Sequence, residues 1–132
     1  MWRTCAIVMC LCVSTVSTVS SASADGSLKC PTKSNVFEEL AKHVRAATCF
    51  EAERVADACG DGIVMSTKLT DVATEVCRAG FGKVPEAVKE FEGISKRCED
   101  KFGNRTPKKL DAQEAVAECR YLAAKLLFVL HR

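Results

Sequence analysis

Six cysteines spread along residues 25–132 constrain the fold of this chain more than any other feature. An even number of cysteines in a chain of this length is typical of a disulfide framework. We therefore predict three disulfides, each stabilising the fold by about 2–4 kcal/mol, mainly because it restricts the unfolded chain. The pattern alone leaves their pairing open. The cysteines are Cys30, Cys49, Cys59, Cys77, Cys98 and Cys119.

The N-terminal segment indicates the compartment in which these disulfides would form. Arg3 precedes an apolar run over residues 5–13, and residues 22–24 read Ala-Ser-Ala, which fits the cleavage rule for signal peptides. The apolar run is shorter than the roughly 20 residues that span a bilayer. We expect residues 1–24 to be a cleaved signal peptide and residues 25–132 to be a single secreted domain.

Charge and cysteine spacing argue against two classes of binding site. Loss of Arg3 with the signal peptide would leave 18 basic and 17 acidic residues, a net charge of +1. So small a charge gives little attraction to nucleic acid. Zinc sites use closely spaced cysteines, whereas nine residues separate the nearest pair, Cys49 and Cys59. We predict no metal, no cofactor and no nucleic-acid partner.

Apolar residues recur with a helical period along most of the chain after residue 35, and no segment shows the alternation of a β-strand. We predict an all-α fold, a compact bundle of four to five short helices cross-linked by three disulfides. The first stretch forms either one long helix or two with a kink near Thr48. The helices are expected to start at an Asn35 N-cap, at Ser66 or Thr67, at Pro85, and at an Asp111 N-cap, with Thr106-Pro107 as an alternative start for the last helix. They are expected to end at the glycines at 60–62, 80–82 and 103.

Four of the cysteines occur in register with the apolar positions of these helices. The Cα atoms of a disulfide lie about 5.5–6 Å apart, and packed helices approach so closely only where their faces touch. We therefore expect the disulfides to join helices face to face. The four are Cys59, Cys77, Cys98 and Cys119.

The C-terminal helix, expected from Ala112 to about Leu130, ends in a run that is apolar except for Lys125. The charges within this helix argue against a membrane span. Its apolar residues could form part of the core, line a pocket for a small apolar ligand, or insert as an exposed tip into a membrane surface or a partner. The residues concerned are Leu126, Leu127, Phe128 and Leu130.

A basic window precedes that helix. It is either a docking patch for an acidic protein surface or anionic lipid head groups, or a solvated connection between helices. Asn104 lies in this window and begins an Asn-Arg-Thr glycosylation motif, whose use we expect Pro107 to lower. The basic residues are Lys96, Arg97, Lys101, Arg105, Lys108 and Lys109.

No catalytic motif is apparent in the sequence. The two histidines, His43 and His131, are expected to lie in solvent, so neither is expected to activate a nucleophile. We therefore predict a secreted, non-enzymatic effector of the venom, salivary, defence or signalling type, which binds an extracellular protein. The alternatives are a carrier of a small apolar ligand and a membrane-active, antimicrobial-type protein that uses its C-terminal helix.

Overall fold

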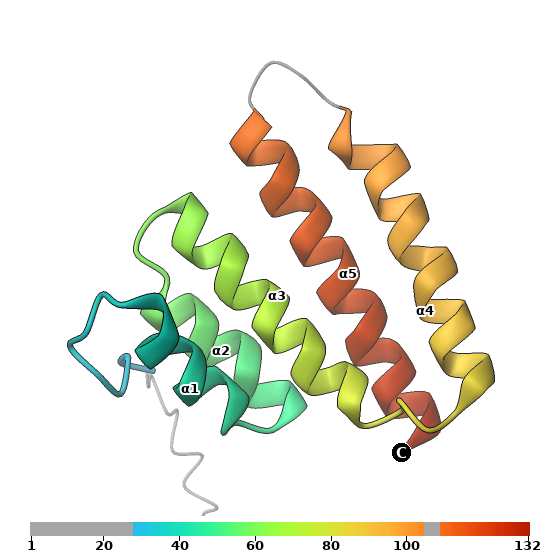
Figure 1. The fold of residues 1–132 in the computed structure, drawn as a ribbon, viewed down its shortest axis with the longest axis horizontal. Helices are drawn as coiled ribbons and strands as arrows, with labels where there is room; N and C mark the ends of the chain where they lie inside the picture. The colour runs from blue at the N-terminus through green and yellow to red at the C-terminus, as the bar shows by residue number, and fades with distance from the viewer. Residues whose placement is uncertain (1–27, 105–108) are drawn as a thin grey trace, which may run out of the picture.

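A computed structural model describes residues 28–104 and 109–132, and shows them as a helical bundle (Figure 1). No strand occurs among these residues, so the predicted all-α fold is confirmed. The predicted signal peptide lies outside the described residues. The elements are α1 (Phe37–Arg45), α2 (Cys49–Cys59), α3 (Ile63–Ala79), α4 (Pro85–Cys98), the short π-helical segment η1 (Glu99–Gly103) and α5 (Lys109–His131).

The long helix α5 lies between α3 and α4 (Figure 1). It packs most extensively against α3, and its contact with α2 is slight. The short helices α1 and α2 pack against each other and against α3. The bundle therefore has an N-terminal group of three helices and a C-terminal pair, joined mainly along α3 and α5.

The helix boundaries settle one alternative and correct three expectations. Residues 37–59 form two helices because Thr48 caps the start of α2, and its backbone N–H and hydroxyl donate to the Glu51 carboxylate at 3.3 and 2.8 Å. The Asn35 N-cap is wrong, since Val36 precedes α1 and no side chain caps that helix. Helix α3 begins at Ile63, ahead of Ser66, and α5 begins at Lys109, ahead of Asp111.

A positive φ at one glycine explains the early start of α3. Gly62 has φ +79°, a left-handed conformation that glycine adopts without a side-chain penalty. The chain therefore turns directly into α3 there, and residues 63–65 join the helix. Pro85 occupies the first turn of α4, as predicted, and its fixed φ suits that position.

All six cysteines of the described residues form disulfides, as predicted, paired Cys30–Cys59, Cys49–Cys77 and Cys98–Cys119. The second joins α2 to α3 and the third joins α4 to α5, so both connect helix faces. The first differs from expectation, because it ties Cys59 to the irregular arm before α1. Within the described residues, no disulfide joins the N-terminal group of helices to the α4–α5 pair.

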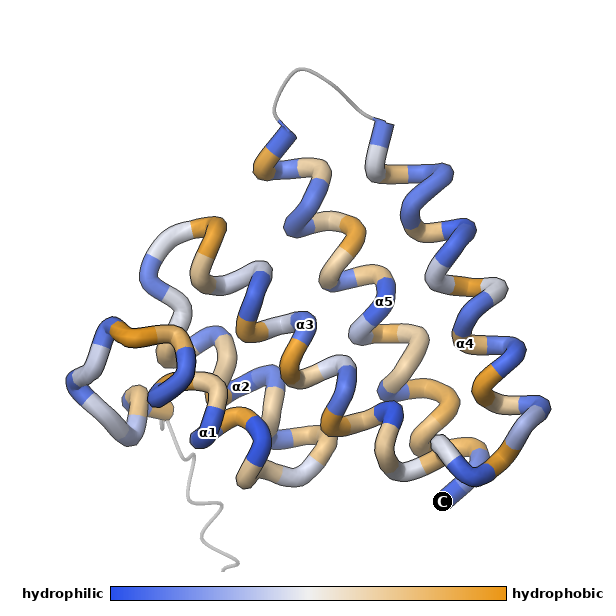
Figure 2. Tube along the Cα trace, in the orientation of Figure 1, coloured by the Kyte–Doolittle hydropathy of each residue, from blue (hydrophilic) through white to orange (hydrophobic). Residues whose placement is uncertain are grey.

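The core lies where α1, α2 and α5 pack around α3, and α4 joins it by packing on α5 and, through Phe91, against Phe81 in the turn after α3. Its largest fully buried side chains include Tyr121, Phe81, Leu69 and Leu127. Figure 2 shows that polar and apolar residues alternate along α4, whereas the C-terminal half of α5 is largely apolar. The C-terminal half of α5 therefore supplies apolar residues to the core on one side, and it also has apolar residues on sides that do not face the core.

Candidate functional site

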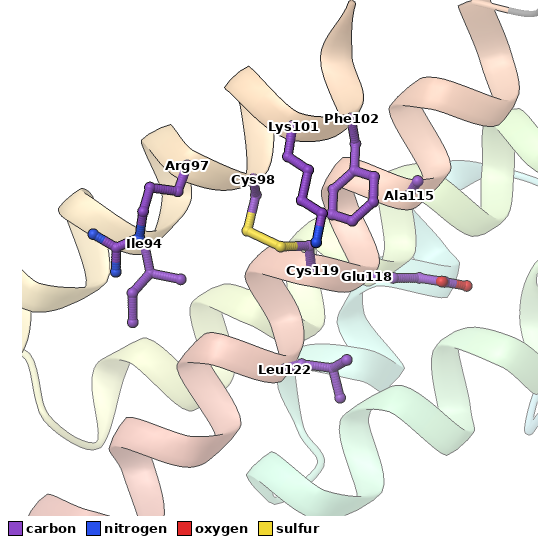
Figure 3. A pocket seen from close by; sticks show the side chains of 9 residues that line it. All are labelled: Ile94, Arg97, Cys98, Lys101, Phe102, Ala115, Glu118, Cys119 and Leu122. Atoms are coloured by element: carbon purple, nitrogen blue, oxygen red, sulfur yellow. A yellow bond between two sulfur atoms is a disulfide. The ribbon is translucent and has the colours of Figure 1, made fainter. Parts of the chain in front are cut away.

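A groove of about 600 Å³ lies between α4 and α5. Figure 3 shows its side chains, with Arg97 and Lys101 coming from α4 and η1, and Glu118 and Leu122 coming from α5. The Cys98–Cys119 disulfide crosses its floor. The remaining lining residues are Ile94, Phe102 and Ala115.

Small side chains explain why this space stays open. The disulfide holds the Cα atoms of Cys98 and Cys119 5.8 Å apart, so the two helices cannot separate here. Neither the cystine nor the nearby Ala115 is large enough to fill the space between the helix axes, which usually lie 8–10 Å apart. The cross-link therefore makes a fixed depression lined by apolar atoms.

The α4 side of the groove is positively charged. Arg97 and Lys101 are exposed and form no ion pair with another described residue. The Lys101 ammonium lies 5.3 Å from the centroid of the Phe102 ring, a cation–π contact that leaves its charge uncompensated. Glu118 supplies the one carboxylate of the lining, on the α5 side.

The structure brings together only part of the predicted basic patch. Arg97 and Lys101 line the groove, while Lys96 is exposed beside it and Lys109 lines a different pocket, between α3 and α5. The other two predicted members, Arg105 and Lys108, lie outside the described residues. Asn104 is exposed at the end of η1, and its glycosylation remains a prediction.

The four apolar residues predicted as one face of the C-terminal helix do not share a face. Leu127 is fully buried in the core, and Phe128 is half-buried with its ring 5.8 Å from that of Phe50, edge to face. Leu126 and Leu130 are exposed, at 56% and 64%. Because residues 126 and 127 point to different sides of a helix, these four residues do not line one ligand-binding face, which was one of the three alternatives.

The exposed leucines instead continue the groove along α5. Leu122 lines the groove and is 58% exposed, and Leu126 and Leu130 follow it at successive four-residue steps. Residues four apart lie on one face of a helix, so these three form an apolar stripe. Leu122 and Phe102 were not predicted as site residues from the sequence. The four-residue spacing of the leucines at 122, 126 and 130 is the sequence pattern that could have predicted Leu122.

The described residues offer little for other chemistry. No helix among them is long and apolar enough to cross a membrane, and no cluster of His, Cys, Asp and Glu side chains there is arranged to hold a metal ion. His43 lies on α1 and His131 in the last turn of α5, and neither lines the groove. The groove contains cations, one carboxylate and apolar side chains, which suit binding.

Comparisons of the chain with protein-family models, curated proteins and solved structures find no match. Its function is therefore inferred from the geometry and chemistry of its own residues.

Proposed function

We propose that the protein is a secreted, non-enzymatic binding protein that docks an extracellular partner protein in the α4–α5 groove. The observation that carries this proposal is the open apolar groove with two uncompensated cations on one wall, continuous with the exposed apolar stripe of α5. The three disulfides suggest an oxidising compartment, which supports secretion.

The groove chemistry favours one kind of partner segment. An amphipathic helix that lays its apolar face in the groove would cover Ile94, Phe102 and Leu122. Carboxylates beside that apolar face would meet Arg97 and Lys101, which gives the docking its orientation. We therefore propose an acidic amphipathic helix of the partner as the occupant.

The shape of the groove favours a protein segment over a small apolar ligand. Pockets for small ligands bury roughly 70–90% of the ligand surface. Here Leu122, in the lining, keeps more than half of its own surface exposed, and the apolar stripe extends beyond the groove to Leu130. A long helix could cover both the groove and the stripe. The disulfide also fixes the groove before binding, which lowers the conformational cost of docking.

The experiment uses two synthetic helical peptides that differ only in charge. Both have leucines at four-residue spacing, flanked by glutamates in one peptide and by lysines in the other. Fluorescence anisotropy should show that the protein binds the acidic peptide more tightly, by about tenfold or more. Equal binding of the two peptides, or no binding of either, would contradict the proposal.

A matched pair of variants locates the binding. Leu122→Glu places a carboxylate in the groove and should weaken binding of the acidic peptide by about tenfold or more. Val64→Glu makes the same kind of change at an exposed position of α3, outside the groove, and should leave binding unchanged. Saturable palmitate binding, or leakage of anionic vesicles, without peptide binding would instead favour the carrier or membrane-active alternative.

A further inference from the structure

A second pocket, of about 380 Å³, lies between α3 and α5 and is lined mainly by polar residues. Thr67, Lys68 and Asp71 come from α3, and Lys109, Gln113 and Arg120 come from α5. The pocket shares no lining residue with the α4–α5 groove.

The pocket and the groove lie on opposite sides of α5. With 3.6 residues per turn, Gln113 and Arg120 fall on one side of the helix, and Ala115 and Leu122 fall about half a turn away. Any role of the pocket is therefore independent of the function proposed for the groove.

Positive charge prevails in this pocket. Lys68, Lys109 and Arg120 face a single carboxylate of the lining, that of Asp71. One guanidinium nitrogen of Arg120 lies 3.9 Å from Glu99, an ion pair that is partly open to solvent. Lys68 lies 5.8 Å from the Phe37 ring centroid, and this contact leaves its charge in place. The cations thus exceed the carboxylates that face them.

Two buried polar atoms of the lining have no hydrogen-bond partner among the described residues. They are the Thr67 hydroxyl oxygen and the Nε of Arg120. Two threonines farther along α3 behave differently, because Thr70 and Thr74 donate to the carbonyls one turn earlier at 3.0 and 2.9 Å. Buried polar groups usually find partners, since leaving them unpaired costs free energy. Neither atom is exposed to solvent in this conformation, so a ligand in the pocket would supply those partners only after the Thr67 and Arg120 side chains rotate toward it.

We propose that this α3–α5 pocket binds a tetrahedral oxyanion, phosphate or sulfate, either as the free ion or as the terminal group of a larger molecule. After a rotation of both side chains, the Thr67 hydroxyl and the Arg120 Nε–H donate hydrogen bonds to the anion oxygens. Guanidinium groups match the geometry of such anions, and hydrogen bonds between ionised groups are the strong ones. Lys68 and Lys109 add attraction from the two sides of the pocket.

The first test titrates the disulfide-bonded protein with inorganic phosphate and inorganic sulfate at constant ionic strength, with chloride as the reference. Amide chemical shifts should report saturable binding with a Kd in about the millimolar range, centred on Thr67 and Arg120. Phenyl phosphate is the third probe. Tighter binding than phosphate indicates a larger phosphorylated ligand, and equal binding indicates the free ion.

Variants separate the proposed contacts from general charge. Thr67→Val keeps the side-chain shape and removes one unpaired hydroxyl, so the fold should tolerate it while phosphate binding weakens about tenfold. Lys109→Gln should also weaken binding. Lys89→Gln, which removes the same charge from an exposed position of α4 outside the pocket, should not.

Three results would overturn the proposal. The first is the absence of saturation below about 10 mM phosphate or sulfate. The second is an equal response to chloride, which would indicate screening of surface charge. The third is unchanged affinity in Thr67→Val. Thermal unfolding of Thr67→Val establishes that it is folded, so its affinity decides the outcome even if an Arg120 substitution disturbs the fold.

Discussion

Tyr121 donates a hydrogen bond from its phenolic hydroxyl to the backbone carbonyl of Cys49, at 3.1 Å and across 72 residues of sequence. Both residues are buried, and the bond connects α5 to the start of α2. Burial, assisted by the charges of Glu53 and Asp57, raises the pKa of Tyr121, so its hydroxyl stays protonated and remains a donor. This contact helps to join two groups of helices that no described disulfide joins.

The loss of this bond should therefore be measurable. Tyr121→Phe removes the donor and leaves the Cys49 carbonyl without it, which we expect to lower the free energy of unfolding by about 1 kcal/mol. Chemical denaturation followed by circular dichroism measures the change. Ser34→Ala is the control: it removes only the solvent-exposed hydrogen bond that the Ser34 hydroxyl accepts from the Val36 backbone N–H, and should change stability less. Equal effects in the two variants would show that the Tyr121 bond contributes nothing.

The Cys98–Cys119 disulfide should support both the fold and the groove. Replacing both cysteines by alanine should lower the free energy of unfolding by about 3 kcal/mol, because the bond closes a loop of moderate length. It should also abolish binding of the acidic peptide, since α4 and α5 are then free to separate. Replacing Cys30 and Cys59 by alanine is the control. That pair should lose stability yet still bind the peptide when folded.

Gly80 is required by its close approach to a neighbouring ring. A Cβ added there would overlap the Phe128 side chain, whereas one added at Gly82 would meet no atom closer than 3.5 Å. The φ of Gly80 is −67°, so its backbone conformation suits any residue. We expect Gly80→Ala to destabilise the protein by about 1–3 kcal/mol through overpacking. Thermal unfolding should show no comparable loss for Gly82→Ala.

Asp71 should make stability depend on pH. Asp71 is exposed at the surface, but partial desolvation of its carboxyl, with a smaller contribution from Glu75, raises its pKa, although Arg120 opposes the shift. Because the folded pKa lies above the unfolded one, ionisation of Asp71 disfavours the fold. Stability associated with this group is therefore highest below the unfolded pKa and falls as pH rises through the folded pKa.

Asp71→Asn tests this direction. The variant should be more stable than the parent near pH 7 and should lose that advantage near pH 3, where the Asp71 carboxyl is protonated in both states. Denaturation curves at the two pH values measure the difference. A constant difference at both values would mean that the ionisation of Asp71 does not affect folding.

The class of fold and the existence of the disulfides follow from local patterns, whereas the pairing does not. Helical periodicity can be read from neighbouring residues, and the number of disulfides from the count of cysteines. The pairing of Cys59 with Cys30 depends on how the arm before α1 folds back, which no local pattern reports. The sequence could not distinguish one long helix from two helices at Thr48, because apolar residues continue across that position. The hydrogen bonds from Thr48 to Glu51 cap a second helix there.

The candidate sites were harder to predict for a related reason. Apolar residues occur on several sides of the end of α5, so periodicity could not tell buried Leu127 from exposed Leu126. Their burial depends on where α3 and α4 pack. Thr67 and Arg120 lie far apart in the sequence, and each is typical of a helix surface. Only the packing of α3 on α5 brings them into one pocket.

Charge reversal in the groove is the measurement to make first. Arg97→Glu with Lys101→Glu should change the preference of the protein from the acidic amphipathic peptide to its lysine counterpart. Lys83→Glu with Lys89→Glu, exposed positions outside the groove, should keep the original preference. A switch confined to the groove variant is the result expected for docking between α4 and α5. An unchanged preference in that variant, or the same switch in both, would contradict it.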